Sequence, residues 1–171
     1  MDRPAVTQLA PPRLVSSDAL LLFGLSQRCP GCGDPAIPAQ WNSFLPYFGQ
    51  IDGQIGNVAY GVIYNSDDSG NYDYMCGVEV REFPTHPPEF TRLRIPPQRY
   101  AVFQHPGHVS AVAGTWKAIW EQGLPGSGFQ AMDGPSFERY DEKFDGRTGL
   151  GGLEIWVPVK TPATETGPAA G

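Results

Sequence analysis

The sequence predicts an α+β domain of two β-α-β-β units with pseudo-twofold symmetry, in which antiparallel sheets leave a ligand cleft between the halves. Three observations lead to this fold class. The 171 residues fit one domain, and 21 Gly and 18 Pro place turns between short elements, which disfavours a helical bundle. The same order of elements occurs twice, in residues 13–80 and 90–160, and the seam between such halves is a preferred place for ligands.

The first unit begins with a strand at Leu20–Gln27 and continues with a short helix that has an aromatic face. Pro38 suits the first turn of this helix, and Pro46 with Gly49 predicts its end. The hydrophobic residues recur at helical spacing, at Ile37, Trp41, Phe44, Leu45 and Phe48. Two β-rich runs around the turn "NSDDSGN" then predict a hairpin with strands at 58–64 and 72–80.

The second unit begins with strands near 90–95 and 99–105. A second helix follows, and Gly123 with Pro125 predicts its end. One face of this helix is hydrophobic and consists of Val109, Val112, Trp116, Ile119 and Trp120. The last two strands lie in "PSFERYDEKFD" and "GGLEIWVPV". Because aromatic residues on a hydrophobic helical stripe usually pack inside, Trp116 and Trp120 are interpreted as core residues, as is Trp41, with Trp116 able to reach the pocket edge.

The composition argues against several classes of function. The net charge is −6, and no basic cluster is denser than "RLR" at 92–94, so the footprint required for binding nucleic acid is missing. No run approaches the roughly 18 apolar residues of a membrane span, and the N-terminus lacks the apolar stretch of a signal peptide. We therefore expect a cytoplasmic monomer or homodimer without direct contact to nucleic acid or membrane. Flexible ends at 1–11 and 161–171 should flank one domain at 12–160.

The cysteine pair in "RCPGCG" suggests two further types of site. Cys29 and Cys32 have the spacing of a redox turn, and they could also join His105 and His108 in a zinc site. However, only about 20 residues precede the strand that leads into the pair, too few for the βαβ unit of a redox fold, and the His spacing is shorter than usual. A plain loop with two thiols, without metal or cofactor, is therefore expected, and Cys76 is interpreted as a small buried strand residue.

Four stretches together resemble the GyrI-like effector-binding domain family in order and spacing. They are "YNSDDSGNYDYMCGVEV", "IPPQRYAVFQHPGHVSAVAGTWKAIW", "FERYDEKFD" and "GLEIWVPV", and the resemblance covers about residues 13–160. The family includes sensor domains of AraC-type and MerR-type multidrug-responsive regulators, the DNA gyrase inhibitory protein and stand-alone small-molecule-binding proteins. The resemblance implies helices on one sheet face and, on the other, a cleft for apolar, often cationic, aromatic compounds. It also implies a pocket glutamate with aromatic walls.

Strand alternation identifies Glu154 as the candidate pocket acid. In "GGLEIWVPV", Leu153, Ile155 and Val157 point to one face of the strand, whereas Glu154 and Trp156 point to the other. If the first set packs under the helices, the second set faces the cleft. A desolvated carboxylate needs hydrogen bonds or a cation, so this pair suits positively charged or electrophilic guests, which Trp156 would bind by stacking and cation–π contact.

Other residues are assigned to the same cleft. Tyr140 in "FERYDE" is the candidate neighbour of Glu154, whereas Glu138 and Glu142 on its strand are interpreted as solvated charges. Alternation in "YMCGVEV" places Met75 and Glu79 on the cleft face, with Glu79 as a second acid.

Three tyrosines and two histidines have weaker assignments. Tyr60, Tyr64 and Tyr74 share strand parity with core-facing valines. His105 and His108 are interpreted as residues that shape the turn before the second helix, with His108 near the helix start, since no catalytic partner for them can be placed.

The predicted cleft leaves three functions open. The first is a sensor or sequestering protein for small amphipathic, aromatic or cationic molecules, with Glu154 as the counter-charge and Trp156 and Tyr140 as walls. The second is a hydrolase in which Glu154 is the general base, since some stand-alone members of the family are similar to hydrolases that open cyclopropane-bearing antibiotics. The third is a gyrase-inhibitor-like protein-binding module. Binding is favoured over catalysis, and a regulatory role would need a separate partner.

Overall fold

A computed structural model describes residues 9–30 and 36–160 of the chain. Its strands are β1 (Arg13–Ser17), β2 (Leu20–Pro30), β3 (Gln54–Tyr64), β4 (Asn71–Val80), β5 (Thr91–Ile95), β6 (Gln98–Gln104), β7 (Gln130–Ala131), β8 (Ser136–Tyr140) and β9 (Leu153–Lys160). The helical segments are α1 (Ala36–Phe44), η1 (Leu45–Tyr47), η2 (Val109–Ala111), α2 (Val112–Ala118), η3 (Ile119–Gly123) and α3 (Leu124–Ser127). Cys32, most of the N-terminal segment expected to be flexible and the whole C-terminal one lie outside the described residues.

The strands form one antiparallel sheet whose order has twofold symmetry. The order is β1-β6-β9-β8-β3-β4-β2-β5, and β7 pairs with β9 at the side. The first unit is β2-α1-β3-β4, the second is β6-α2-β8-β9, and the β3–β8 pair joins them. The strand order read from β1 has the same pattern as the order read from β5, with β6, β9 and β8 of the second unit matching β2, β4 and β3 of the first. The pseudo-twofold axis therefore passes through the β3–β8 pair. The predicted α+β fold with duplicated units is confirmed.

The two units also exchange their leading strands. β1 precedes the first unit but pairs with β6 of the second, and β5 precedes the second unit but pairs with β2 of the first. The sequence predicts β5, but it does not predict β1 as a separate strand. Because of this exchange, each half completes the sheet of the other.

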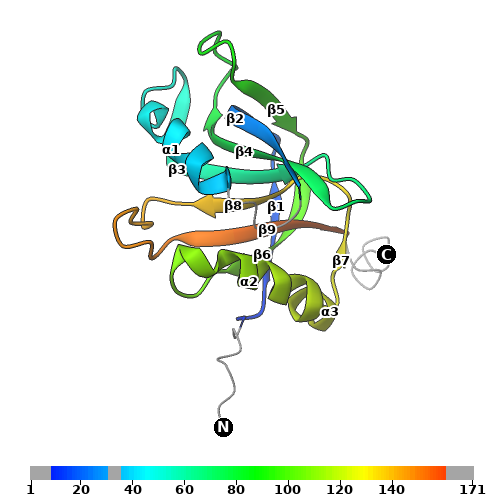
Figure 1. Ribbon diagram of the computed structural model, residues 1–171. Helices are drawn as coiled ribbons and strands as arrows, with labels where there is room; N and C mark the ends of the chain where they lie inside the picture. The colour runs from blue at the N-terminus through cyan, green and yellow to red at the C-terminus, as the bar shows by residue number, and fades with distance from the viewer. Residues whose placement is uncertain (1–8, 31–35, 161–171) are drawn as a thin grey trace.

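Helices α1 and α2 cover the same face of the sheet, one over each half, and β3, β8 and β9 are visible between them (Figure 1). Under α1, Phe44 packs with the strand residues Phe23, Tyr74 and Val78. Under α2, the buried cluster contains Phe103, Trp116, Ile119, Ile155 and Val157. This side of the sheet is called the helix face below.

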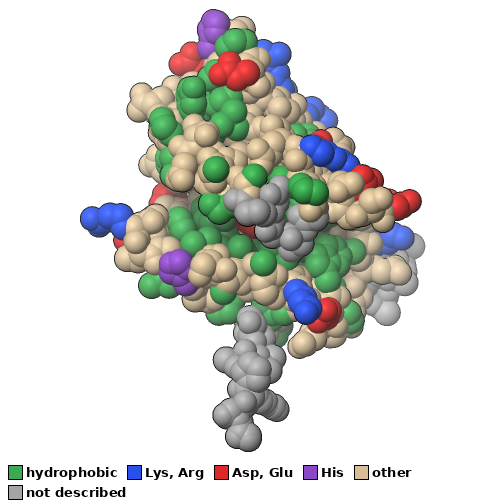
Figure 2. All heavy atoms as spheres, in the orientation of Figure 1, with side chains coloured by type: hydrophobic (Ala, Val, Ile, Leu, Met, Phe, Trp, Pro, Cys, Tyr) green, Lys and Arg blue, Asp and Glu red, His purple; other side chains and the backbone are tan. Residues whose placement is uncertain are grey.

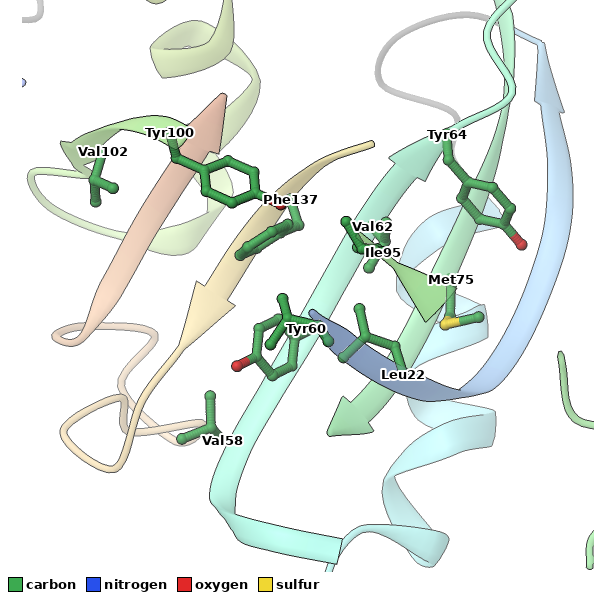
Figure 3. Packing of buried hydrophobic residues seen from close by; sticks show 11 residues of the cluster. Leu22, Val58, Tyr60, Val62, Tyr64, Met75, Ile95, Tyr100, Val102 and Phe137 are labelled. Atoms are coloured by element: carbon green, nitrogen blue, oxygen red, sulfur yellow. The ribbon is translucent and has the colours of Figure 1, made fainter. Parts of the chain in front are cut away.

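The opposite side, called the inner face, is filled by the protein's own hydrophobic side chains. Tyr60, Val62, Met75, Tyr100 and Phe137 belong to this buried cluster (Figure 3). The rings of Tyr60 and Tyr100 both contact Phe137 edge-on, with centroid distances of 5.4 and 5.3 Å. Both faces of the central strands are therefore buried, one by the helices and one by this cluster.

The second helical region differs from its predicted form. It does not end at Gly123 but passes through a π-helical turn at η3, where the Leu124 amide donates to the Ile119 carbonyl, and it ends at Gly128 with a φ of 84°. The turn brings Pro125 into the first turn of α3, where a missing N–H costs little. The interpretation of Trp120 as a core residue is wrong, because 48% of it is exposed.

Candidate functional site

The residues predicted to form one cleft lie on two different faces of the sheet. In the β8–β9 pair, Arg139 stands opposite Glu154 and Phe137 stands opposite Trp156, so these four side chains share the inner face. Tyr140 stands opposite Leu153 and points to the helix face. The sequence-based assignment of Tyr140 as a neighbour of Glu154 is therefore wrong, since Leu153 and Glu154 are consecutive residues of β9 and point to opposite faces.

Glu154 already has two partners. Its Oε2 accepts a hydrogen bond from Arg13 Nη2 at 2.9 Å, and its Oε1 accepts one from Trp156 Nε1 at 3.1 Å. The ring of Trp156 stacks on Phe137 at a centroid distance of 5.3 Å. The carboxylate thus has a cationic partner within the chain, and the indole has an aromatic one. A ligand role for Glu154 and Trp156 stays a prediction.

The other inner-face residues are also engaged. Met75 is fully buried in the inner cluster. Burial raises the pKa of Glu79, and the nearby charge of Arg139 lowers it in part. Arg139 also contacts the phenol of Tyr60 and feels the charge of Glu154. The acids on this face are therefore balanced by Arg13 and Arg139.

The helix face contains a second carboxylate in a different environment. Glu138 on β8 is only 5% exposed, so its interpretation as a solvated charge is wrong. Its Oε1 accepts hydrogen bonds from the hydroxyls of Tyr74 and Tyr140 at 2.9 and 2.8 Å. Its Oε2 accepts one from Trp116 Nε1 at 2.9 Å. All three donors are neutral, and Glu138 forms no ion pair with any described residue.

The two halves of the domain both contribute to this carboxylate. Tyr74 comes from β4 of the first unit, and Trp116 comes from α2 of the second. Trp41 of α1 donates its Nε1 hydrogen to the Tyr74 hydroxyl at 3.0 Å and meets the ring of Tyr140 edge-on at 5.3 Å. Glu138 thus connects both helices at the seam between the units. The interpretation of Trp116 as a core residue is confirmed by its 6% exposure, and its place at the edge of a pocket stays a prediction.

A glycine makes this arrangement possible. Gly61 on β3 stands directly opposite Glu138 in the β3–β8 pair. A Cβ atom on Gly61 would lie 2.2 Å from the Tyr74 hydroxyl and 2.7 Å from Glu138 Oε1, which is closer than non-bonded atoms approach. The missing side chain therefore leaves the space in which the phenol reaches the carboxylate.

Burial dominates the ionisation of the group. It raises the pKa of Glu138, although the bonds from Trp116, Tyr140 and Tyr74 and the nearby His105 oppose the rise. Burial, followed by the charge of Glu138, raises the pKa of Tyr74 and of Tyr140 well above the ordinary value, so both phenols remain donors at neutral pH.

In the space-filling view, a groove runs between the part of the molecule that carries α1 and the part that carries α2, and hydrophobic side chains are visible along it (Figure 2). Ile63 of β3 packs against the clusters under both helices and therefore lies at this seam. The neighbouring rings of Trp41 and Tyr140 are half-buried. A carboxylate, aromatic rings and apolar surface thus occur together at the point where the units meet. We call this group, made of Glu138, Tyr74, Tyr140, Trp41 and Trp116, the seam site.

A second, polar hollow of about 520 Å³ lies elsewhere, between β2, β3, β4 and β5. Arg28 in its wall is already paired with Asp67 at 2.9 Å and Asp73 at 3.3 Å. Its opposite charges neutralise one another, so it is a weaker candidate than the seam site.

Within residues 9–30 and 36–160, no three His, Cys, Asp or Glu side chains gather closely enough to hold a metal ion. Cys29 and Cys76 are both buried, as the sequence predicts for Cys76. No helix in those ranges has the length and hydrophobicity needed to cross a bilayer.

A duplicated β-α-β-β domain with an acid and aromatic rings at its seam is a small-molecule-binding architecture. The model of the GyrI-like small molecule binding domain matches residues 10–160, which is nearly the whole described chain. The chain belongs to this family, as the resemblance of its sequence motifs indicates.

Three proteins illustrate what the chain is similar to. The transcriptional regulator BrlR of Pseudomonas aeruginosa strain PAO1 is 30% identical over 149 residues, which are 86% of this chain and 54% of BrlR. The chain thus spans about half the length of this curated relative. The solved structure of SAV2435 bound to tetraphenylphosphonium has a TM-score of 0.68 at 19% identity, and the match covers 88% of this chain and 94% of SAV2435. The C-terminal domain of EcmrR has a TM-score of 0.56 at 16% identity, with coverage of 90% and 98%.

Proposed function

We propose that this chain binds hydrophobic cations with aromatic rings in the hollow between α1 and α2, with Glu138 as the counter-charge. The observation that supports this most strongly is the buried carboxylate whose hydrogen-bond donors are all neutral. A buried charge is costly unless it meets an opposite charge, and neutral donors stabilise it without cancelling it. A cationic guest would supply the missing positive charge.

The aromatic rings give the hollow its second property. Trp41 and Tyr140 are half-buried residues of the hydrogen-bonded group around the carboxylate, so neither is fully enclosed by the chain. The faces of such rings attract cations, and their edges and faces contribute apolar contact area. Charge and aromatic surface together favour ligands such as the cation named with SAV2435, a protein that shares the fold of this chain.

The proposal is tested by titrating the chain with tetraphenylphosphonium and recording tryptophan fluorescence. We expect saturable binding with a Kd on the order of micromolar, about −8 kcal/mol. The fluorescence should respond because Trp41 and Trp116 both belong to the seam site. Tetraphenylborate has the same shape and the opposite charge and is the control ligand. It should bind at least about tenfold more weakly, since Glu138 repels it. Equal binding of both ions would contradict a counter-charge role.

Binding of tetraphenylphosphonium should weaken as the pH falls. The ligand does not titrate, whereas burial raises the pKa of Glu138 above that of an ordinary glutamate. Below the raised pKa the carboxyl group is neutral and no longer attracts the cation, so affinity is high above this pKa and decreases through it. The measurement is a series of titrations between about pH 4 and 8, and the midpoint should lie above about 4.3. In the Glu138→Gln variant any remaining binding should not depend on pH in this range.

A hydrolase is the second candidate function, because the same carboxyl group has a raised pKa and two phenols beside it. Such a group can take a proton from water that attacks an electrophilic or strained ring. Incubation with a cyclopropane-bearing electrophile followed by mass spectrometry separates the two functions. A binding protein returns its ligand unchanged, whereas a hydrolase returns a product that is one water heavier.

A further inference from the structure

His105 and Thr115 form a buried pair that the proposed binding function does not use. They are 8% and 1% exposed, and His105 Nδ1 lies 2.7 Å from Thr115 Oγ1. His105 Nε2 lies 2.7 Å from the carbonyl oxygen of His108. Because a carbonyl only accepts hydrogen bonds, Nε2 donates to it, and Nδ1 forms the second hydrogen bond of the ring with the Thr115 hydroxyl.

The pair connects the sheet to the helix that carries a donor of the seam site. His105 directly follows β6, and its amide donates to the Leu153 carbonyl at the start of β9 at 3.0 Å. Thr115 lies in α2, one residue before Trp116. One end of the contact is therefore held by the sheet, and the other end belongs to the helix.

The rotation of α2 about its axis decides where the Trp116 indole points. Successive residues are about 100° apart around a helix, so a small rotation moves the indole N–H away from its acceptor. Regular α-helix extends over only seven residues here, because the 3-10 turn η2 precedes it and the π turn η3 follows it. Hydrogen bonding within so short a segment does not define its orientation on the sheet.

We infer that His105 and Thr115 are positioning residues: their hydrogen bond sets the rotation of α2 and thereby brings the indole N–H of Trp116 to Glu138. The consequence for ligand affinity rests on the proposed function, whereas the consequence for the indole does not. His105 is not a catalytic residue in this role, since it acts through Thr115 and the helix.

The test removes the hydroxyl group and follows the indole directly. Valine has nearly the shape of threonine without the hydroxyl, so Thr115→Val deletes the bond and Thr115→Ser restores it. The chain has four tryptophans, hence four indole N–H signals in a ¹⁵N-correlated NMR spectrum, and Trp116→Phe identifies the signal of Trp116. We expect this signal to move in Thr115→Val toward the position of an indole without a hydrogen bond, and to return in Thr115→Ser.

Affinity for tetraphenylphosphonium is the second measurement. It should fall about three- to tenfold in Thr115→Val and stay within about twofold of the wild type in Thr115→Ser, because one lost hydrogen bond corresponds to about that factor. Ser110→Ala is the control, since it deletes an exposed hydroxyl beside His108 at the start of the same helical region. Its Trp116 signal and affinity should not change.

The inference is overturned if Thr115→Val keeps both the Trp116 signal and the affinity of the wild type, or if Thr115→Ser behaves like the valine variant. If Thr115→Val loses its dispersed NMR spectrum, His105→Gln removes the contact from the sheet side, and an unmoved Trp116 signal in that variant overturns the inference as well. If the wild type does not bind the cation but the Trp116 signal responds as expected, the proposed function fails and the positioning role stands.

Discussion

Glu138→Gln should lower the affinity for tetraphenylphosphonium by at least about 30-fold, which corresponds to about 2 kcal/mol. At an effective dielectric constant near 20, a carboxylate and a cation about 5 Å apart attract each other by about 3 kcal/mol, and desolvation offsets part of this. The glutamine oxygen can still accept hydrogen bonds from Tyr74 and Tyr140, whereas the glutamine NH2 cannot accept the one from Trp116. The variant should therefore lose about 1–3 kcal/mol of stability but keep its fold. The measurement is the same fluorescence titration, with far-UV circular dichroism to check the fold.

Glu154→Gln is the matched control, because Glu154 is the acid that strand alternation favours. It is also nearly buried, but it already pairs with Arg13, half of whose side chain is exposed. We expect its affinity for the cation to stay within about twofold of the wild type. The opposite result, a strong loss of affinity in Glu154→Gln and none in Glu138→Gln, would place the ligand on the inner face and contradict the seam-site proposal.

The elements of the fold follow from local patterns in the sequence. The strands predicted at 58–64 and 72–80 lie within β3 and β4. This hairpin is predictable because the turn between its strands is rich in Asn, Asp, Ser and Gly. The strand β1 could not be predicted in the same way. Its five residues show the mixed burial of an edge strand, and its partner β6 lies about 85 residues further along the chain. Such pairing depends on tertiary structure, which local hydrophobic patterns do not contain.

The site is harder to predict, because the alternation of side chains along a strand does not tell which face of the strand is exposed to solvent. In "FERYDE" it separates Phe137 and Arg139 from Glu138 and Tyr140, and the structure has this separation. The sequence does not show that helices cover one face and the inner cluster the other, so that both sides of β8 are buried. Glu138, which lies between Phe137 and Arg139, then appears solvated although it is buried. The feature that could have identified Glu138 as a buried residue is the central position of its strand, which lies between β3 and β9.

Alternation succeeds where one side of a strand is a recognisable hydrophobic ladder. Ile155 and Val157 of β9 pack under α2, as their pattern predicts. Glu154 and Trp156 therefore do face away from the helices. What the pattern lacks is the tertiary arrangement of the strands, which brings Arg13 of β1 to Glu154 and Tyr74 of β4 to Glu138. The residues of the candidate site thus depend on pairing between strands, and the fold class depends mainly on the elements themselves.

The seam site also depends on a residue without a side chain, and Gly61→Ala should disrupt it strongly. The added Cβ would lie 2.2 Å from the Tyr74 hydroxyl, and Tyr74 is only 2% exposed, so the ring has no free space into which to move. We expect a loss of about 2–3 kcal/mol in the free energy of unfolding and at least about a tenfold weaker binding of tetraphenylphosphonium. Chemical denaturation and the fluorescence titration measure the two effects.

Two further variants show whether the loss arises at the seam. Gly114→Ala adds the same methyl group to α2, where nothing lies within 4 Å of it, and should stabilise the chain by about 0.5–1 kcal/mol because alanine favours helix. In Gly61→Ala combined with Tyr74→Phe, the atom nearest the new methyl group is gone. The double variant should therefore lose less stability than the sum of the two single variants. Additive losses would show that Gly61 acts on the backbone, independently of the phenol that reaches Glu138.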